Sequence, residues 1–409
     1  MPVSQSKLKG LKGRVQVPKQ RDEPAWSGPQ GQGPNGGITF SALSRWLTCK
    51  ERFRVQYVEG LKPAETFNSR MEFGNMWHVL EEGLAAFKQG KGPPWFSENG
   101  ISQYIKKLYD KFPHSRQEVD EWANKVRAMF PLYVEHWRQQ PDVQNRTPLL
   151  QEEPFDVPLC LPSGRQVRLR GKFDSVDLLN ASVPCTCGAD RTGPSAEAHT
   201  KKCPASKPHT TYGPPGIWLQ ENKTKSAIDT IKLTRQLTFD LQTMIYLVAL
   251  MEYDLAAILE PKGFDAIPLL GVRYNVIRRS AHKSVESMLE KVEKDRAAGR
   301  IGEWFLRLKV PVMPEDVAKF RRECLDPVLE NLCDDHEWWL RCFRSKGDVW
   351  DAGARVRACT HHFPRHFRFP FGVYAPLHES GASDIDSFLE TGSRLGFRET
   401  EVVFPELAA

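Results

Sequence analysis

Three side chains in the middle of the chain have the types and spacing of a metal-dependent hydrolytic site. Asp174 follows an alternating segment at residues 167–170, and Glu221 and Lys223 lie two residues apart further along the chain. Residues two apart on a strand point to the same face. Two carboxylates can hold a hard divalent cation through oxygen, while an ammonium orients or activates a water beside a phosphate. These three residues therefore predict hydrolysis of a phosphodiester.

Two strands must position these side chains, and the pattern places each acid near a strand end. The first strand, residues 166–179, is expected to pair antiparallel with residues 149–158 through a turn at 162–164. The second strand follows the breakers at 213–216 and opens with a short apolar run. The first strand also carries a rival acid, Asp177.

Around these residues the chain resembles the PD-(D/E)XK nuclease superfamily, in particular its RecB-like branch, which includes phage exonucleases. Five motifs of that branch occur here in the same order: G-x-x-x-H, an acid that opens the first core strand, G-x-x-D, (D/E)-x-K and Q-x-x-x-Y. They fall on Gly74 and His78, on Glu152 or Glu153, on Gly171 and Asp174, on Glu221 and Lys223, and on Gln242 and Tyr246. An isolated D…ExK pattern arises often by chance, whereas five ordered motifs are much more specific.

The resemblance implies a deoxyribonuclease that depends on Mg²⁺ or Mn²⁺. Asp174, Glu221 and Lys223 would be the catalytic residues, with Lys223 serving the attacking water. The metal ligands would be His78, Asp174, Glu221, the backbone carbonyl of Asn222 and, as one option, Glu153. Asp174 is preferred over Asp177 because it completes the G-x-x-D motif.

Several side chains after these motifs are expected to contact DNA. Gln242 and Tyr246 are four residues apart and share a helix face, and in the family's pattern this pair faces the active site. Arg235 lies one or two turns earlier and is a candidate phosphate contact. Arg278 and Arg279 end a strand at 268–279 that closely resembles a run in phage exonucleases, and they are expected to hold the DNA backbone. A solvated strand end is the alternative for these two arginines.

An insertion of residues 180–216 separates the two catalytic strands, where relatives usually have a short turn. The insertion is too polar to build a core of its own. Its soft or borderline metal ligands are Cys185, Cys187, His199 and Cys203. A structural Zn²⁺ held by these four residues would supply the missing stability, and an ordinary flexible insertion is the alternative.

A second group of ligand-type side chains lies near the C-terminus. It consists of Cys359, His361, His362 and His366. Relatives often bind an iron–sulfur cluster with three cysteines in this region and one near the N-terminal helix, where this chain has Cys49. Residues 369–377 contain no cysteine, so we do not expect an iron–sulfur cluster. Another metal is one alternative, and a basic surface that packs or binds phosphate is preferred.

Composition limits the class of protein. The chain has 409 residues with 40% apolar and 26% charged residues, which describes a globular protein. It has no apolar run of about 18 residues and no N-terminal signal segment, so we expect no membrane span and a cytoplasmic location in a bacterial or phage-infected cell. Nine cysteines at irregular spacing favour reduced thiols or metal ligands over disulfides. The net charge of +6 suits a polyanion partner.

The expected fold is a mixed α/β nuclease core, with a central sheet flanked by helices and additional N- and C-terminal helices. Residues 1–37 are rich in Gly, Pro, Gln and Lys and predict a disordered basic tail. The nuclease domain should span 38–372, and residues 373–409 form an acidic C-terminal segment. Apolar periodicity predicts helices at 41–58, 71–88, 116–140, 284–298 and 317–343, and one long helix or two at 228–260.

The expected function is exonucleolytic cleavage of DNA from linear duplex or single-stranded ends, in phage or bacterial recombination, repair or DNA processing. A recombination protein is an expected partner, and the oligomeric state is left open. Three alternatives remain at this point. The chain could be an endonuclease or a CRISPR-adaptation type nuclease of the same fold, a catalytically silent DNA-binding module, or a non-nuclease that uses the C-terminal His/Cys group.

Overall fold

The computed structural model describes most of the chain outside its N-terminus and two long internal segments. The described residues are 24–88, 90–91, 99–138, 146–179, 216–260, 267–344, 373, 394–400, 402–404 and 407. They divide into two compact units, one of residues Glu65–Glu330 and one of Met1–Ala64 with Asn331–Ala409. The expected zinc ligands of the 180–216 insertion and the His/Cys group at 359–366 lie outside the described residues.

The larger unit is built on a mixed β-sheet. Its strands are β3 (Arg146–Cys160), β4 (Gln166–Leu179), β5 (Gly216–Lys225), β6 (Leu269–Arg278) and β7 (Phe305–Pro311). They pair in this order, with β5 and β6 parallel and the other pairs antiparallel. The crossover between the parallel strands carries α7 (Thr230–Leu237), α8 (Leu241–Glu252) and α9 (Ala256–Leu259).

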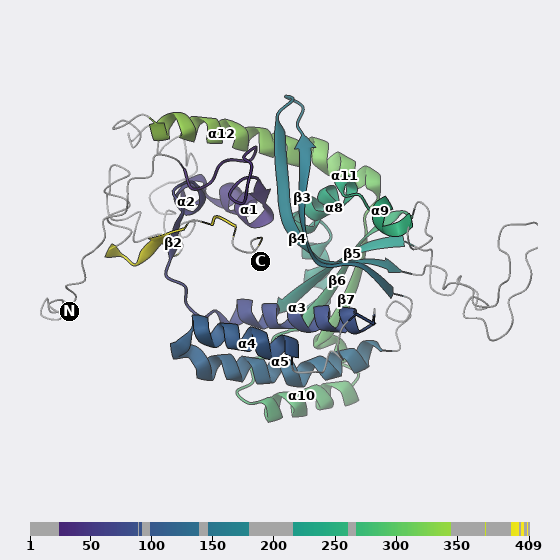
Figure 1. Cartoon of the computed structure of the whole chain (residues 1–409). Coiled ribbons are helices and arrows are strands. Elements are labelled where there is room, and N and C mark those ends of the chain that lie inside the picture. The colour runs from purple at the N-terminus through teal and green to yellow at the C-terminus, as the bar shows by residue number, and fades with distance from the viewer. Residues whose placement is uncertain are drawn as a thin grey trace, which may run out of the picture. The chain divides into compact units, whose positions relative to one another are not determined.

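Helices cover both faces of this sheet (Figure 1). One layer consists of α3 (Ser69–Lys88), α4 (Asn99–Lys111), α5 (Arg116–Trp137) and α10 (Val285–Ala297). On the other face lie α8, α9 and α11 (Pro314–Phe320). The predicted fold class, a mixed central sheet flanked by helices, is therefore confirmed.

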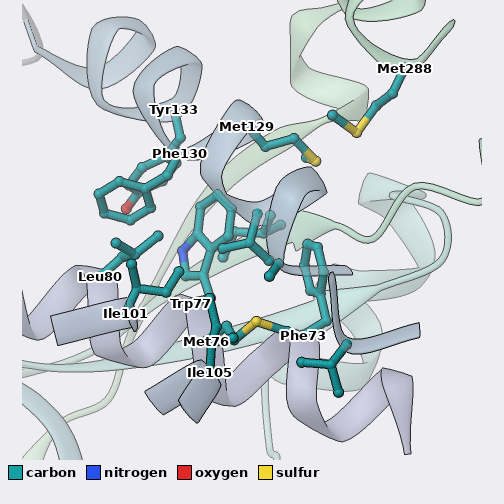
Figure 2. Packing of buried hydrophobic residues seen from close by; sticks show 14 of the residues in the cluster. Phe73, Met76, Trp77, Leu80, Ile101, Ile105, Met129, Phe130, Tyr133 and Met288 are labelled. Atoms are coloured by element: carbon teal, nitrogen blue, oxygen red, sulfur yellow. The ribbon is translucent and has the colours of Figure 1, made fainter. Parts of the chain in front are cut away.

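A buried aromatic cluster fixes α3 against α5. Trp77 is fully buried and meets the rings of Phe130 and Tyr133 edge to face, at centroid distances of 5.1 and 5.2 Å. Figure 2 shows these rings with Met76 and Met129 beside them. Because burial of each such side chain contributes roughly 1.5–3 kcal/mol, this cluster anchors the helix that carries His78.

The smaller unit contains α1 (Phe40–Thr48), α2 (Lys50–Phe53), a π-helical segment at Arg54–Val58, most of α12 (Asp326–Arg344), and the short pair β2 (Leu61–Pro63) and β8 (Phe397–Glu399). Trp26 is fully buried in it and packs edge-on against Phe53 and His336. Its indole N–H donates to the Gly37 carbonyl at 2.8 Å. The structured region therefore begins no later than Pro24, earlier than the expected start at Ile38.

Local capping explains where several helices differ from the expected ranges. The N-cap of α1 is Thr39, whose side chain accepts the Ala42 N–H, so this helix begins at Phe40 and not at the expected residue 41. The segment 228–260, expected to form one helix or two, forms three, and Asp240 caps the second of them by accepting the Thr243 N–H. None of the helices in the described ranges is both long and apolar enough to cross a bilayer.

Candidate active site

The candidate site lies where β4 and β5 separate. Their pairing runs from Leu179 opposite Gly216 to Ser175 opposite Gln220 and stops there. One residue beyond this last pair, a side-chain hydrogen bond replaces the backbone hydrogen bonds between the strands. Asp174 Oδ2 accepts the backbone N–H of Asn222 at 2.8 Å. The acids were expected at strand ends, but β4 continues to Leu179 and β5 to Lys225. The two acids therefore lie within their strands, at the fork where the strands separate, and both are buried.

Glu221, Lys223 and Gln242 form a connected group on one side of this fork. Lys223 Nζ donates to Glu221 Oε1 at 2.9 Å and to Gln242 Oε1 at 2.7 Å. The amide nitrogen of Gln242 donates to the same Glu221 oxygen at 2.7 Å. Asp240 approaches Lys223 at 3.8 Å. The predicted helix residue Gln242 thus touches both residues of the E-x-K motif.

On the other side of the fork, α3 brings His78 to two carboxylates. His78 Nδ1 lies 2.8 Å from Glu152 Oε1 and 3.6 Å from Asp174 Oδ1. The second oxygen of Glu152 pairs with Lys172 Nζ at 2.6 Å. Ligand atoms of His78, Glu152 and Asp174 all lie within 4.8 Å of one another, a spacing that can hold a metal ion.

Glu152, rather than Glu153, is the strand acid that joins this group. Strand alternation keeps Glu153 on the face of Phe155, which packs against Tyr246. Glu152 has a φ of 48°, the left-handed region, and it is the one non-glycine residue with positive φ in the described part of the chain. A long side chain seldom adopts this conformation, and such strain gathers at functional sites. The alternation of side chains along a strand sequence gives no sign of this positive φ.

Burial and crowded charge shift the pKa values of these groups. Burial, followed by the charge of Asp174, raises the pKa of Glu221 to about 7. Burial is also the largest cause of the raised pKa of Asp174. Burial lowers the pKa of His78, but Asp174 and Glu152 outweigh it, and the pKa is raised to about 9. The cluster therefore holds more negative charge than its own cations neutralise.

This chemistry fits a divalent cation. Glu221 is 2% exposed, and its Oε2 has no hydrogen-bond partner among the residues that the structure describes. Leaving a buried carboxylate oxygen without a partner costs roughly 1–3 kcal/mol or more, so such an atom calls for an explanation. Oxygen ligands of this kind suit Mg²⁺ or Mn²⁺. Asp174, Glu221 and the Asn222 carbonyl are the groups that would hold the ion.

Gly171 and Tyr246 have a packing role next to the site. A Cβ on Gly171 would lie 2.5 Å from the Phe155 ring and 3.3 Å from the Tyr246 ring. Tyr246 is 8% exposed and meets the rings of Phe155 and Phe173 edge-on. In the described structure, these rings hold the strand that carries Asp174 against α8.

The predicted DNA-contacting arginines lie on α7 and at the end of β6. Arg235 is exposed on α7, which directly precedes the helix of Gln242. The Arg278 guanidinium lies over the Trp304 ring at 4.7 Å. The Arg279 N–H donates to the Lys225 carbonyl at 2.7 Å, two residues beyond Lys223 on β5.

A buried ionic network on the opposite sheet face was missed by sequence reasoning. Asp177 is fully buried between Arg273 Nη2 at 2.5 Å and Arg146 Nε at 2.8 Å, and it accepts the Ser175 hydroxyl at 2.7 Å. Arg273 also donates to Gln220. The rival acid Asp177 therefore has a structural role, as the centre of a buried ion-pair network. The only sequence signal was an arginine within the apolar β6 strand.

The network extends to the backbone beneath the site. Asn222 Oδ1 accepts from Asn275 Nδ2 at 3.0 Å, and Asn275 Nδ2 also reaches the Tyr133 hydroxyl at 2.6 Å. These contacts fix the peptide unit whose N–H holds Asp174. Such supporting hydrogen bonds orient the groups that bind a metal.

Comparison with known proteins agrees with this geometry. A family model of the PD-(D/E)XK nuclease superfamily matches residues 38–183. The match includes His78, Glu152 and Asp174 and ends before β5. A search of curated proteins returns no match. The mixed sheet flanked by helices and the acidic fork agree with this match, and residues 38–183 of the chain resemble the PD-(D/E)XK nuclease superfamily.

Proposed function

We propose that the protein is a metal-dependent DNA exonuclease whose reaction takes place at the fork between β4 and β5. The observation that carries this proposal is the buried Glu221 oxygen, next to Asp174 and Lys223, that has no hydrogen-bond partner in the described part of the chain. A role in phage or bacterial recombination, repair or DNA processing belongs to the same proposal. DNA ends are the proposed substrate.

The reaction is hydrolysis of a phosphodiester. A water oxygen forms a bond to phosphorus, and the bond from phosphorus to one deoxyribose oxygen breaks, which leaves a phosphomonoester and a free hydroxyl. A bound Mg²⁺ or Mn²⁺ would supply Lewis acidity and compensate developing charge on the phosphate. Asp174 and Glu221 would hold that ion, and the Asn222 N–H keeps Asp174 oriented toward it.

Lys223 acts as a cation in this account. Burial lowers its pKa, but Glu221 and Asp240 outweigh burial and raise the pKa above its ordinary value. The side chain therefore stays an ammonium at neutral pH, and it donates hydrogen bonds instead of accepting the proton of the water. Its hydrogen bonds to Glu221 and Gln242 hold the ammonium beside the acids.

The test compares two DNA substrates of the same sequence, an end-labelled linear duplex and a closed circle, in Mg²⁺, Mn²⁺ or EDTA. We expect metal-dependent loss of the linear DNA alone, and a decrease of roughly 100- to 1,000-fold in Lys223→Ala, because one positioned charge is lost. Cleavage of both substrates would identify an endonuclease. Binding of DNA without cleavage in any metal would identify a silent binding module.

A further inference from the structure

Two large apolar side chains lie in solvent, Ile231 on α7 and Phe239 two residues beyond the end of this helix at Leu237. Ile231 is 70% exposed and Phe239 is 76% exposed, more than any other large apolar side chain in the described part of the chain. Single exposed apolar residues are ordinary on protein surfaces. These two differ from that case because Arg235 lies midway between them, four residues from each, which places Ile231 and Arg235 on one helical face.

The helix buries its opposite side normally. Leu233 and Leu237 are each 4% exposed, and Asp229 caps the helix by accepting the Lys232 N–H at 3.0 Å. Leu233 and Leu237 therefore anchor α7, while Ile231 and Arg235 face solvent. We name the three side chains Ile231, Arg235 and Phe239 the α7 stripe.

The α7 stripe leads directly into the candidate active site. Phe239 is followed by Asp240, which approaches Lys223 at 3.8 Å and caps α8. Two residues further, Gln242 contacts both Glu221 and Lys223. A strand of substrate that leaves the acids along this helix would therefore meet Phe239 first.

The charge of this surface suits a polyanion. Its basic side chains are Lys225, Lys232 and Arg235. The two acids of the segment, Asp229 and Asp240, both accept backbone N–H groups as helix caps. A protein partner would need only apolar area, whereas an exposed aromatic ring that follows several basic side chains matches the pattern of single-stranded nucleic acid sites, in which nucleobases stack on rings and cations hold phosphates.

We propose that the α7 stripe binds a single strand of DNA at the mouth of the active site, with a base stacked on Phe239 and a phosphate held by Arg235. This inference rests on the proposed nuclease function for its substrate. It adds that the strand near the reacting phosphate is unpaired, because a base within a duplex has no free face to offer the ring.

The test measures affinity for a fluorescent single-stranded oligonucleotide and for the matching blunt duplex, by anisotropy in EDTA, so that no cleavage is required. We expect Phe239→Ala to weaken single-strand binding by about 5- to 100-fold, and duplex binding much less. Phe239→Trp should bind as wild type, whereas Phe239→Leu should bind as weakly as the alanine variant. Met313→Ala removes another exposed apolar side chain, 53% exposed, and should change nothing.

Salt dependence separates the two parts of the stripe. Arg235→Gln should reduce the slope of log affinity against log salt by about 0.7, the value for one phosphate contact to a single strand, while Phe239→Ala leaves the slope unchanged. Arg322→Gln, in an exposed ion pair with Glu323, is the matched charge control.

Several results would overturn the inference. They are wild-type single-strand affinity in Phe239→Ala or Phe239→Leu, equal losses for single strand and duplex, and an oligomer in sedimentation velocity that Phe239→Ala dissociates without a change in DNA affinity. The last result would make the stripe a subunit interface. Because binding is read without metal, a wild-type protein that binds single strands through Phe239 but never cleaves would support the stripe while rejecting the nuclease proposal.

Discussion

At the scale of single residues, we propose that Glu152, and not Glu153, is the acid that supports the metal. Glu152 has a positive φ and contacts His78, while Glu153 stays on the strand face of Phe155. We expect Glu152→Gln to lower cleavage by about 10- to 100-fold, the range for groups that orient metal ligands.

Glu153→Gln is the matched control for that variant, since it makes the same chemical change one residue away. It should cleave at close to the wild-type rate. Single-turnover rates at saturating Mg²⁺ measure both variants. If Glu153→Gln lowered cleavage and Glu152→Gln did not, the strand register around Glu152 would be wrong.

The pKa of Glu221, raised to about 7, predicts how metal binding depends on pH. Below pH 7 the carboxyl carries a proton that a cation must displace, so affinity for Mg²⁺ should fall as pH falls, approaching tenfold per pH unit. Above pH 7 the affinity should level off. Calorimetry in buffers of different ionisation enthalpy measures the affinity and the released proton. Glu221→Gln should bind weakly and without this pH dependence.

At the scale of elements, the network around Asp177 holds β3, β4, β5 and β6 together. It joins Arg146 on β3 to Arg273 on β6 through one fully buried carboxylate. Removing one partner of a buried ionic group leaves the others uncompensated, which costs about 3–5 kcal/mol. Asp177→Asn should therefore lower the free energy of unfolding by about that amount, as measured by urea denaturation.

Asp156→Asn is the control for this prediction. Asp156 pairs with Arg168, but its side chain is 37% exposed, and exposed pairs contribute about 0–1 kcal/mol. Equal, small losses of stability in the two variants would mean that the buried network contributes little to stability.

The same elements show what the sequence could predict. Ordered motifs placed His78, Asp174, Glu221, Lys223 and Gln242, and the structure brings all of them to one fork. The alternation at residues 166–179 also predicted β4 with its bounds. Capping residues were harder to recognise in the sequence, since α7 ends at Leu237 and Asp240 caps the start of α8 only three residues later.

The remaining features depend on contacts between distant segments. The positive φ of Glu152 and the burial of Asp177 between two arginines follow from strand pairing over long sequence separations. The pairing of β4 with β5 ends near the acids, and no local pattern indicates where two strands will separate. The insertion at 180–216 lies outside the described residues, so its predicted zinc site stays a prediction.

At the scale of the whole molecule, the smaller unit has an acid-sensitive core. His336 is 8% exposed, packs against Trp26, and its Nε2 has no partner among the described residues. Burial lowers the pKa of His336 to about 4. The folded state therefore holds fewer protons than the unfolded state between pH 6.5 and 4, and stability is lost as pH falls through this range.

The expected loss is about 3 kcal/mol at pH 4 relative to pH 7, from a pKa shift of about 2.5 units. Tryptophan fluorescence during urea denaturation at each pH measures it, and NMR titration of the His336 ring measures the pKa directly. His336→Leu should show a smaller dependence on pH over the same range. A ring that titrates near pH 6.5 in the folded protein would contradict this prediction.

We propose that DNA is hydrolysed at the fork between β4 and β5, and the variant Asp174→Asn examines this proposal. An asparagine side chain can still accept the Asn222 N–H, so the fold should survive while the metal ligand is lost. Cleavage of end-labelled linear duplex in Mg²⁺ or Mn²⁺ should be lost in Asp174→Asn and kept in wild type and in Asp156→Asn, with equal melting temperatures. Cleavage by Asp174→Asn at the wild-type rate, or none by wild type in either metal, would contradict the account.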